Sequence, residues 1–283
     1  MIIKNDKELH ILREGGRKLA AVLNDVVKTV KPGVRTMELD ELAECLILRS
    51  GGTPSFKGYK AYMASSKYPA SLCVSVNDEV VHGIPSVRIL GKGDVVGLDI
   101  GMWFDGYCTD TAKTVIVGEW NLLSENSLAP PRNKSELNSA AAAPTQNFHP
   151  KDSALRLVAA TKKALELGIR EVKAGVKTGD IGFAVQSHLE KEGFGVVREL
   201  VGHGVGKAVH EEPEIPNWGN RGSGVKLQEG LVIAIEPMAA QGHYRVKLAP
   251  DGWTWLTFDG SIAAHFEHTL VVTKNGSEVL TKV

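Results

Sequence analysis

Two aspartates, Asp99 and Asp110, lie within apolar, strand-like segments of the sequence. Residues 94–101 and 107–117 have the composition of two β-strands, and an Asp-Gly pair between them favours a tight turn. If that turn is centred between residues 104 and 105, the two aspartates face each other, with Cβ atoms roughly 4.5–5.5 Å apart. Buried carboxylates at that distance need a proton or a cation between them, so the pair predicts a metal site.

Three further residues with ligand-forming side chains, His203, Glu236 and Glu267, also lie in apolar segments. Taken singly, a buried histidine is more often a core residue, and a buried glutamate is as often part of an ion pair as a ligand. However, Lys and Arg are nearly absent from these segments, apart from Lys113. Since ion pairs cannot neutralise four buried acids there, metal ions are the better explanation.

Four carboxylates and one imidazole carry too much negative charge for a single catalytic zinc ion with three protein ligands. They suit two divalent cations about 3.5–4 Å apart, with carboxylates bridging them. Oxygen-rich ligation with one histidine fits Mn, Fe(II), Co or Zn, and the donor set does not choose among these. Such a pair of ions activates water and polarises a carbonyl group, so the predicted reaction is hydrolysis.

Two other histidines, His82 and His210, lie close in sequence to the predicted strands and ligands. Each could be an ordinary surface or core residue. In a metal-containing cleft, they could instead hold a carbonyl group or transfer protons near neutral pH. His265 shares the strand face of Glu267 and is a candidate to support a ligand, whereas His268 points to the opposite face.

The elements that must position these residues form an internal repeat. Apolar spacing predicts helices over residues 6–30 and 36–50, and again over 154–173 and 178–192. The motifs Lys-Pro-Gly-Val-Arg-Thr and Lys-Ala-Gly-Val-Lys-Thr, which join the helices of each pair, are separated by a constant offset of 142 residues. Strand-like segments follow each pair. The pattern predicts an α+β fold of two similar halves, with the site in the cleft between them.

Composition excludes several functional classes. The 283 residues include 33 basic and 33 acidic side chains, so no basic surface for nucleic acid or an acidic membrane is expected. The three cysteines, Cys45, Cys73 and Cys108, show no CxxC spacing, which argues against disulfides and zinc knuckles. No export signal or long apolar run occurs, so we expect a cytoplasmic protein.

The repeat is interrupted at about residues 119–150, where Pro-Pro, an alanine run and many Ser, Asn and Gln residues occur. This composition predicts a flexible surface insertion in a single catalytic domain spanning residues 1–283. A loop without a function of its own is the simpler interpretation, and a partner-binding loop is the alternative.

The ordered set of motifs resembles the type I methionine aminopeptidases over nearly the whole chain. The matching segments are 77–85, 94–99, 106–112, 202–206, 210–219, 235–238 and 266–269. The resemblance implies the pita-bread fold, in which two pseudo-symmetric halves place a central antiparallel sheet under covering helices. It also implies a hydrolase that removes the N-terminal methionine from nascent proteins and peptides and prefers a small second residue.

The resemblance assigns a role to each predicted ligand. Asp99 would bind one metal ion, Asp110 and Glu267 would bridge both ions, and His203 and Glu236 would complete the second. A bridging hydroxide would attack the peptide carbonyl, and Glu236 would help to move the proton.

The resemblance also implies a binding site for the substrate. His82 and His210 match histidines that contact the substrate and steady the tetrahedral intermediate. Tyr68, Cys73 and Trp253 are candidates for the wall of a methionine pocket, although core packing would explain each equally well. The stretch 60–67 is several residues longer than in short members of the family, which leaves the shape of the pocket open.

The implied partners are the N-terminal peptides of nascent chains, with a transient ribosome contact, in a monomeric protein without nucleic-acid specificity or a membrane anchor. Two rival functions share the fold. Prolidases and aminopeptidases P usually carry a large extra N-terminal domain, whereas the repeat here begins near residue 6. Non-enzymatic pita-bread proteins typically lack the metal ligands, and all five are present here.

Overall fold

The computed structural model describes residues 1–60, 66–119 and 150–283. The predicted insertion at 119–150 and the longer stretch at 60–67 therefore lie largely outside the described residues. The helices are α1 (Asp6–Thr29), α2 (Thr36–Arg49), α3 (Pro150–Glu171) and α4 (Thr178–Lys191).

The strands of the first half are β1 (Thr53–Pro54), β2 (Leu72–Val76), β3 (Glu79–Val81), β4 (Val95–Phe104) and β5 (Tyr107–Ile116). Those of the second half are β6 (Gly195–Val196), β7 (Gly202–Gly204), β8 (Glu211–Ile215), β9 (Val232–Ile235), β10 (Met238–Ala240), β11 (Val246–Leu248), β12 (Trp255–Thr257), β13 (Ala263–His265), β14 (Glu267–Val272) and β15 (Ser277–Val279).

A large antiparallel sheet connects the two halves. Within the described residues it has nine strands, with the central order β1-β4-β5-β14-β9-β7-β8, while β2 pairs with β4 and β15 with β14. Two small sheets, β13-β10-β6 and β11-β12-β3, flank it. The junction between the halves is the pairing of β5 with β14, so residues from both halves meet at the middle of the sheet.

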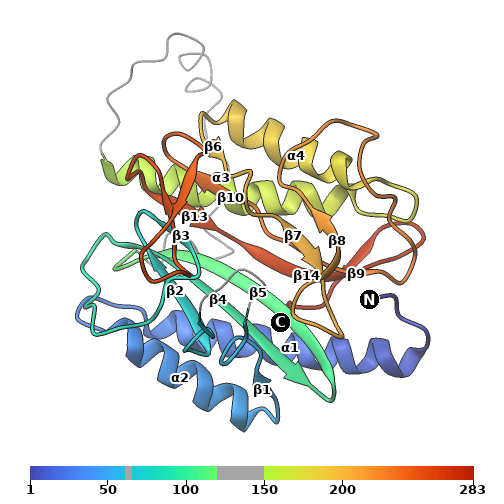
Figure 1. The fold of residues 1–283 in the computed structure, drawn as a ribbon, viewed down its shortest axis with the longest axis horizontal. Helices are drawn as coiled ribbons and strands as arrows, with labels where there is room; N and C mark the ends of the chain where they lie inside the picture. The colour runs from blue at the N-terminus through green and yellow to red at the C-terminus, as the bar shows by residue number, and fades with distance from the viewer. Residues whose placement is uncertain (61–65, 120–149) are drawn as a thin grey trace, which may run out of the picture.

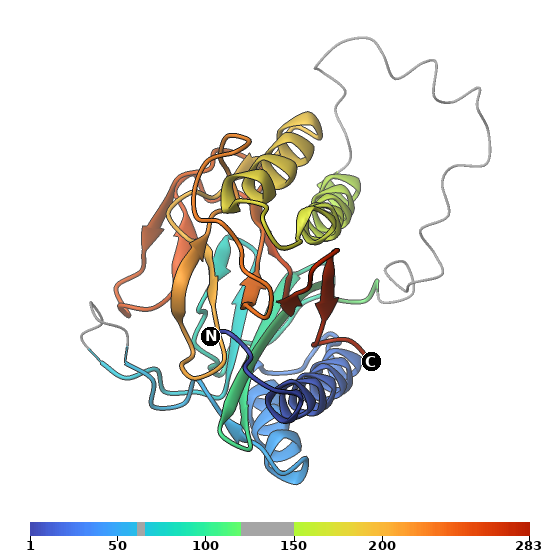
Figure 2. The same cartoon turned by 90° about the vertical axis from the view of Figure 1, so that its right-hand side faces the viewer.

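The two helix pairs cover different ends of this sheet, with α3 and α4 above and α1 and α2 below in both Figure 1 and Figure 2. Leu19, Leu23 and Val26 of α1 pack with the apolar residues of β2 and β4 in one core cluster. Leu157 and Val185, from α3 and α4, pack with β9 and β14 in another. Each half therefore buries its own apolar helix faces.

The predicted 142-residue repeat is visible in the backbone. The helices α2 and α4 begin at Thr36 and Thr178, which are 142 residues apart. Gly33 and Gly175, also 142 residues apart, have φ angles of +92° and +93°. Both glycines form the left-handed turn that leads into a helix, a conformation that strains other residues. The shared turn geometry supports the pseudo-symmetric architecture.

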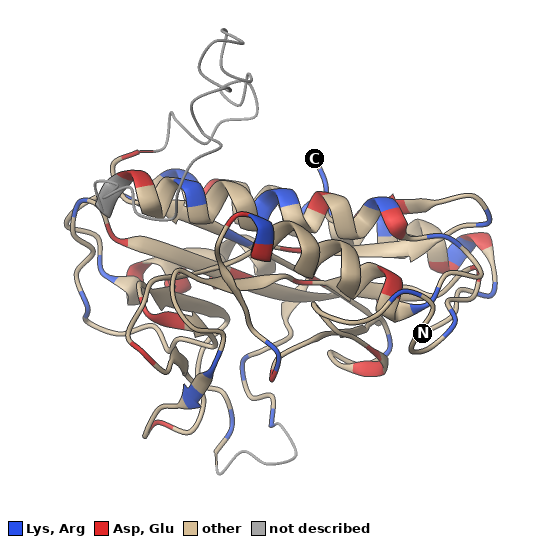
Figure 3. Cartoon of the chain, turned by 90° about the horizontal axis from the view of Figure 1, so that it is seen from above, with Lys and Arg blue, Asp and Glu red and all other residues tan. Residues whose placement is uncertain are grey.

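The surface carries both signs of charge. Figure 3 shows acidic and basic positions interspersed along α3 and α4, as expected for a chain with zero formal net charge. None of the helices that the structure describes combines the length and apolar character needed to cross a lipid bilayer.

Candidate metal centre and substrate pocket

The strand register places three acidic side chains on one face of the large sheet. Asp99 on β4 pairs with Ala112 on β5, and Ala112 pairs on its other side with Glu267 on β14. Asp110 lies two residues before Ala112, and residues two apart on a strand project from the same face. Because the central Ala112 is small, it leaves the space above the sheet open for the longer acidic side chains.

The predicted register of the hairpin is wrong by two residues. Asp110 pairs with Gly101 instead of with Asp99. The turn consists of Asp105 and Gly106, whose φ angles of +47° and +83° suit a two-residue hairpin turn, and it is therefore centred one position later than expected. A shift of two residues preserves side-chain direction, so both aspartates still point to the same side.

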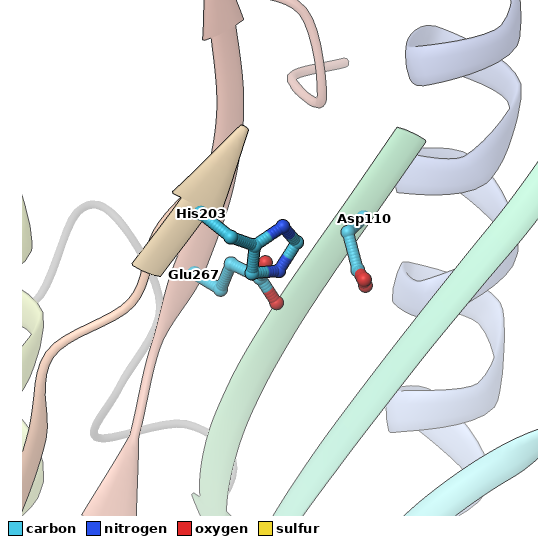
Figure 4. Close-up of side chains that lie close together, drawn as sticks. All are labelled: Asp110, His203 and Glu267. Carbon is cyan, nitrogen blue, oxygen red and sulfur yellow. The ribbon is translucent and has the colours of Figure 1, made fainter. Parts of the chain in front are cut away.

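The fourth acid and the histidine come from the second half of the chain. Glu236 immediately follows β9. One of its carboxylate oxygens, Oε1, lies 3.4 Å from His203 Nε2, and the other, Oε2, lies 3.5 Å from His265 Nε2. Ligand atoms of Asp110, His203 and Glu267 all lie within 4.8 Å of one another. Figure 4 shows these three side chains converging from β5, β7 and β14.

Glycines allow the strand that carries His203 to pack closely against its neighbours. A Cβ atom on Gly202 would lie 2.4 Å from the carbonyl oxygen of Ala234, and one on Gly204 would lie 2.3 Å from that of Glu212. These distances are too short for any larger residue. The Gly-His-Gly sequence therefore brings the imidazole next to the acids of the sheet.

Burial opposes ionisation of the four acids. It raises the pKa of Asp99 to about 7 and that of Glu236 to about 8, and it raises the pKa values of Asp110 and Glu267 well above their ordinary values. Neighbouring carboxylates add to the effect at all of these sites except Glu236, where burial is the cause. Such a group of acids can ionise together only if cations neutralise it.

The donor atoms fit a divalent metal. Among the described residues, Asp99 Oδ1, Asp110 Oδ1 and Glu267 Oε1 are buried without a hydrogen-bond partner. Buried polar atoms normally have partners, and carboxylate oxygens are good ligands for divalent cations. His203 Nδ1 donates a 2.9 Å hydrogen bond to the carbonyl oxygen of Gly204. Its Nε2 lone pair is therefore free to bind a metal, as in many metal-binding histidines.

The predicted substrate residues lie around the same pocket. Its walls are formed by Phe56, Tyr59, Tyr68, Cys73, His82, Asp99, Asp110, His203, His210, Glu236, Trp253 and Glu267. Every residue that the sequence singled out as a ligand or substrate contact is therefore at this pocket. His265 does not line the pocket, but its Nε2 lies 3.5 Å from the carboxylate of Glu236, which does. His268 also lies outside the pocket lining, and its ring hydrogen-bonds to Thr281 Oγ1.

The apolar wall is held by specific contacts. The rings of Tyr68 and Trp253 pack edge to face, with centroids 5.2 Å apart. The Tyr68 hydroxyl donates to the carbonyl oxygen of Gly83 at 2.9 Å. Cys73 on β2 pairs directly with Asp99 on β4, so the apolar wall lies next to the acidic residues. Burial raises the pKa of the Cys73 thiol, which stays protonated and behaves as a small apolar group.

Two histidines approach the pocket from different directions. His82 follows β3 with a left-handed φ of +59°, a conformation uncommon for residues other than glycine. Burial lowers its pKa to about 4, so it is neutral at pH 7. The side chain of His210 is exposed at the pocket mouth, where its ring lies edge to face with His203 at 4.4 Å.

Two wall residues, Phe56 and Tyr59, were not predicted from the sequence. They follow β1, a two-residue strand with no clear alternation, and they precede residues that lie outside the described part of the chain. The only available signal was the pair of aromatic residues in a short polar segment. Tyr59 donates or accepts a 2.8 Å hydrogen bond with His210 Nδ1.

Comparison with known sequences identifies the family. The sequence profile of metallopeptidase family M24 matches residues 10–128 and 136–274. The chain belongs to metallopeptidase family M24. This membership confirms the predicted class of enzyme, a metal-dependent peptidase, and it supports divalent-metal use by the cluster described above.

Within M24, several full-length relatives are methionine aminopeptidases, which confirms the predicted resemblance. The methionine aminopeptidase of Clostridium acetobutylicum is 41% identical over 99% of this chain and 98% of its own length. Methionine aminopeptidase 1 of Bacillus subtilis is 40% identical over the full length of both chains. The crystal structure of the Thermotoga maritima methionine aminopeptidase superimposes on this chain with a TM-score of 0.84 at 38% identity. The alignment covers 100% of both chains.

The M24 fold extends to more distant structures. A prolidase from Pyrococcus furiosus superimposes with a TM-score of 0.69 at 21% identity, and this chain covers 66% of it. At that identity the similarity concerns the fold alone. The predicted pita-bread architecture is confirmed by these two levels of structural similarity.

Proposed function

We propose that this M24 peptidase removes the N-terminal methionine from nascent proteins and peptides and prefers a small second residue. Full-length identity of about 40% to methionine aminopeptidases is the observation that carries this proposal. The pocket supports it independently, because Tyr68, Cys73 and Trp253 offer aromatic and sulfur surfaces that suit a thioether side chain.

The proposed centre holds two divalent cations. Asp99 would serve one ion, Asp110 and Glu267 would bridge both, and His203 and Glu236 would complete the second. When bound, divalent ions at this centre would lower the pKa of a water molecule and polarise the scissile carbonyl. Mn, Fe(II), Co and Zn all remain compatible with the oxygen-rich donor set.

The surrounding residues orient the substrate and move its protons. Glu236 lies between two imidazoles, and its carboxylate would accept a proton from the attacking water and pass it to the leaving amine. His82 and His210 would hold the carbonyl oxygen of the substrate, since both line the pocket near the acids. Cys73 faces Asp99 across the strands, which would place the methionine side chain beside the metals.

A peptide panel tests the proposal. The protein, reconstituted with Mn²⁺, Co²⁺ or Fe²⁺, should release methionine from Met-Ala and Met-Gly peptides far faster than from peptides with a bulky second residue. Asp110→Asn should abolish this release, because it removes one charge from the proposed bridge. Asp105→Asn, in the exposed hairpin turn, is the matched control and should leave release unchanged. Cleavage of Xaa-Pro dipeptides without cleavage of Met-Ala would refute the proposal.

We further propose a cytoplasmic monomer that meets its substrates at the ribosome by a transient contact. The mixed surface charge and the absence of membrane-spanning helices among the described residues are consistent with this setting. Light scattering of the metal-loaded protein tests the monomer, and co-sedimentation with ribosomes at low and physiological salt tests the contact.

A further inference from the structure

The contact between Tyr59 and His210 determines which ring nitrogen of His210 carries the proton. The hydroxyl of Tyr59 lies 2.8 Å from His210 Nδ1, and the two rings pack edge to face at 5.2 Å. Tyr59 comes from the first half of the chain, and His210 comes from the second. The contact therefore joins the two halves at the pocket that the four acids also line.

The backbone holds Tyr59 in place on both sides. Its N–H donates to the carbonyl oxygen of Phe56 at 2.9 Å, and its carbonyl oxygen accepts from the N–H of Tyr68 at 2.8 Å. Phe56 and Tyr68 both line the pocket. The hydroxyl is thus aimed at His210 by the same segment that builds the apolar wall.

The chemistry of the two groups sets the direction of the hydrogen bond. A phenol hydroxyl can donate or accept, whereas a neutral imidazole has one donor nitrogen and one acceptor nitrogen. Imidazole nitrogen is the stronger acceptor of the two groups, and in the described part of the chain the hydroxyl of Tyr59 has no other acceptor. Tyr59 therefore donates to Nδ1, which leaves the ring proton of His210 on Nε2.

The neighbouring histidine has the opposite arrangement. His203 donates from Nδ1 to the carbonyl oxygen of Gly204, so its Nε2 is a bare acceptor. The two rings are only 4.4 Å apart, yet one presents a lone pair and the other presents an N–H group. Because their hydrogen-bond partners differ, His203 is suited to bind a metal and His210 is suited to donate a hydrogen bond.

We propose that Tyr59 is a positioning residue that holds His210 as the Nε2–H tautomer, so that His210 donates a hydrogen bond to the oxygen of the scissile carbonyl. This inference rests on the proposed function for its substrate. As the peptide carbonyl is attacked, negative charge develops on its oxygen, and a fixed N–H donor stabilises that charge. Without Tyr59, His210 would spend part of its time with Nε2 unprotonated and facing the same oxygen unfavourably.

The test combines a tautomer measurement with kinetics on Tyr59→Phe, which removes the hydroxyl and retains the ring. Long-range ¹H–¹⁵N NMR of the substrate-free protein, with His210 assigned from a His210→Gln variant, should show the Nε2–H tautomer in the wild type. In Tyr59→Phe it should show a mixture of tautomers. The kcat for a Met-Ala peptide should fall about 10- to 100-fold with KM within about twofold, since a donor to the developing charge acts on the transition state.

Two further variants separate positioning from general damage. Tyr107→Phe, which removes a hydroxyl bonded to Glu8 outside the pocket, should leave both readouts unchanged. In a His210→Gln background, Tyr59→Phe should have no additional effect on kcat, because it acts through the histidine.

Three results would overturn the inference. These are an Nδ1–H tautomer in the wild type, an unchanged tautomer in Tyr59→Phe, and a full additional loss of kcat in the double variant. Because the NMR experiment uses no substrate, its outcome is independent of the proposed function. If the enzyme cleaved only Xaa-Pro peptides, the proposed function would fail, and the same kinetic comparison on those peptides would decide the role of Tyr59.

Discussion

At the residue scale, the ionisation of Asp99 and Glu236 couples the site to folding. Burial holds their pKa values at about 7 and about 8 in the folded chain, above their ordinary values of 3.8 and 4.5. Between about pH 6.5 and 8 the folded state therefore keeps protons that the unfolded state has lost. Raised pKa values contribute stability at low pH that disappears as the pH rises through the folded values.

We therefore predict that metal-free protein becomes less stable from about pH 6.5 to 8, by up to about 1.4 kcal/mol per pH unit for each titrating group. The histidines do not reverse this trend, because the lowered pKa values of His82 and His203 act only below about pH 6.5. Urea denaturation of chelator-treated protein measures the slope. Added Mn²⁺ should restore stability most strongly at the higher pH, where the acids can ionise to bind it.

Asp99→Asn is the control for this prediction, because it removes one of the titrating groups while preserving most of the side-chain shape. Its slope should be shallower than that of the wild type. A metal-free wild type whose stability rises or stays constant over this pH range would contradict the assigned ionisation.

At the element scale, the β4–β5 hairpin is the structure that sets the site. Gly101, opposite Asp110, packs where a Cβ atom would lie 2.2 Å from Ser55 Oγ and 2.8 Å from Phe56 Cε1. Gly97 lies four residues earlier on the same strand, and its nearest side-chain neighbours would be 3.7 Å from a Cβ atom. Close packing at the pocket thus requires glycine at position 101, whereas position 97 has room for a Cβ atom.

Gly101→Ala should consequently displace Phe56 from the pocket wall, raise KM for a Met-Ala peptide several-fold and cost about 1–3 kcal/mol of stability. Gly97→Ala is its matched control and should change KM little. Steady-state kinetics and denaturant unfolding of both variants measure the difference. Equal effects of the two substitutions would contradict the close packing of Phe56 against β4.

The same hairpin shows how far the sequence could predict the site. The shared face of Asp99 and Asp110 was predictable, because a pairing error of two residues leaves each side chain on the same face of the sheet. The pairing of the two strands was not predicted correctly. The expected turn lies one residue before the Asp105-Gly106 turn of the structure, and this difference shifts the pairing by two residues. Nor was β8 predicted, because Pro213 and neighbouring glutamates resemble a loop in the sequence. Tyr59 reaches His210 only through tertiary structure, which no local pattern records.

At the scale of the whole molecule, the proposed metal ligands come from both halves of the repeat. Asp99 and Asp110 lie on strands of the first half, whereas His203, Glu236 and Glu267 belong to the second. The β5–β14 pairing brings them together at the middle of one sheet. The helix repeat and its constant offset were predictable from the sequence, because local apolar spacing indicates the helices and the two matching motifs between them give the offset. The arrangement of the sheet strands required the three-dimensional structure.

We have proposed that two cations lie at this junction, bridged by Asp110 and Glu267. Anomalous diffraction at the manganese edge, from crystals of the Mn²⁺-loaded protein, tests it most directly. We expect two peaks about 3.5–4 Å apart, both within bonding distance of these two carboxylates. A single peak at full loading, or two peaks of which neither contacts both Asp110 and Glu267, would contradict it.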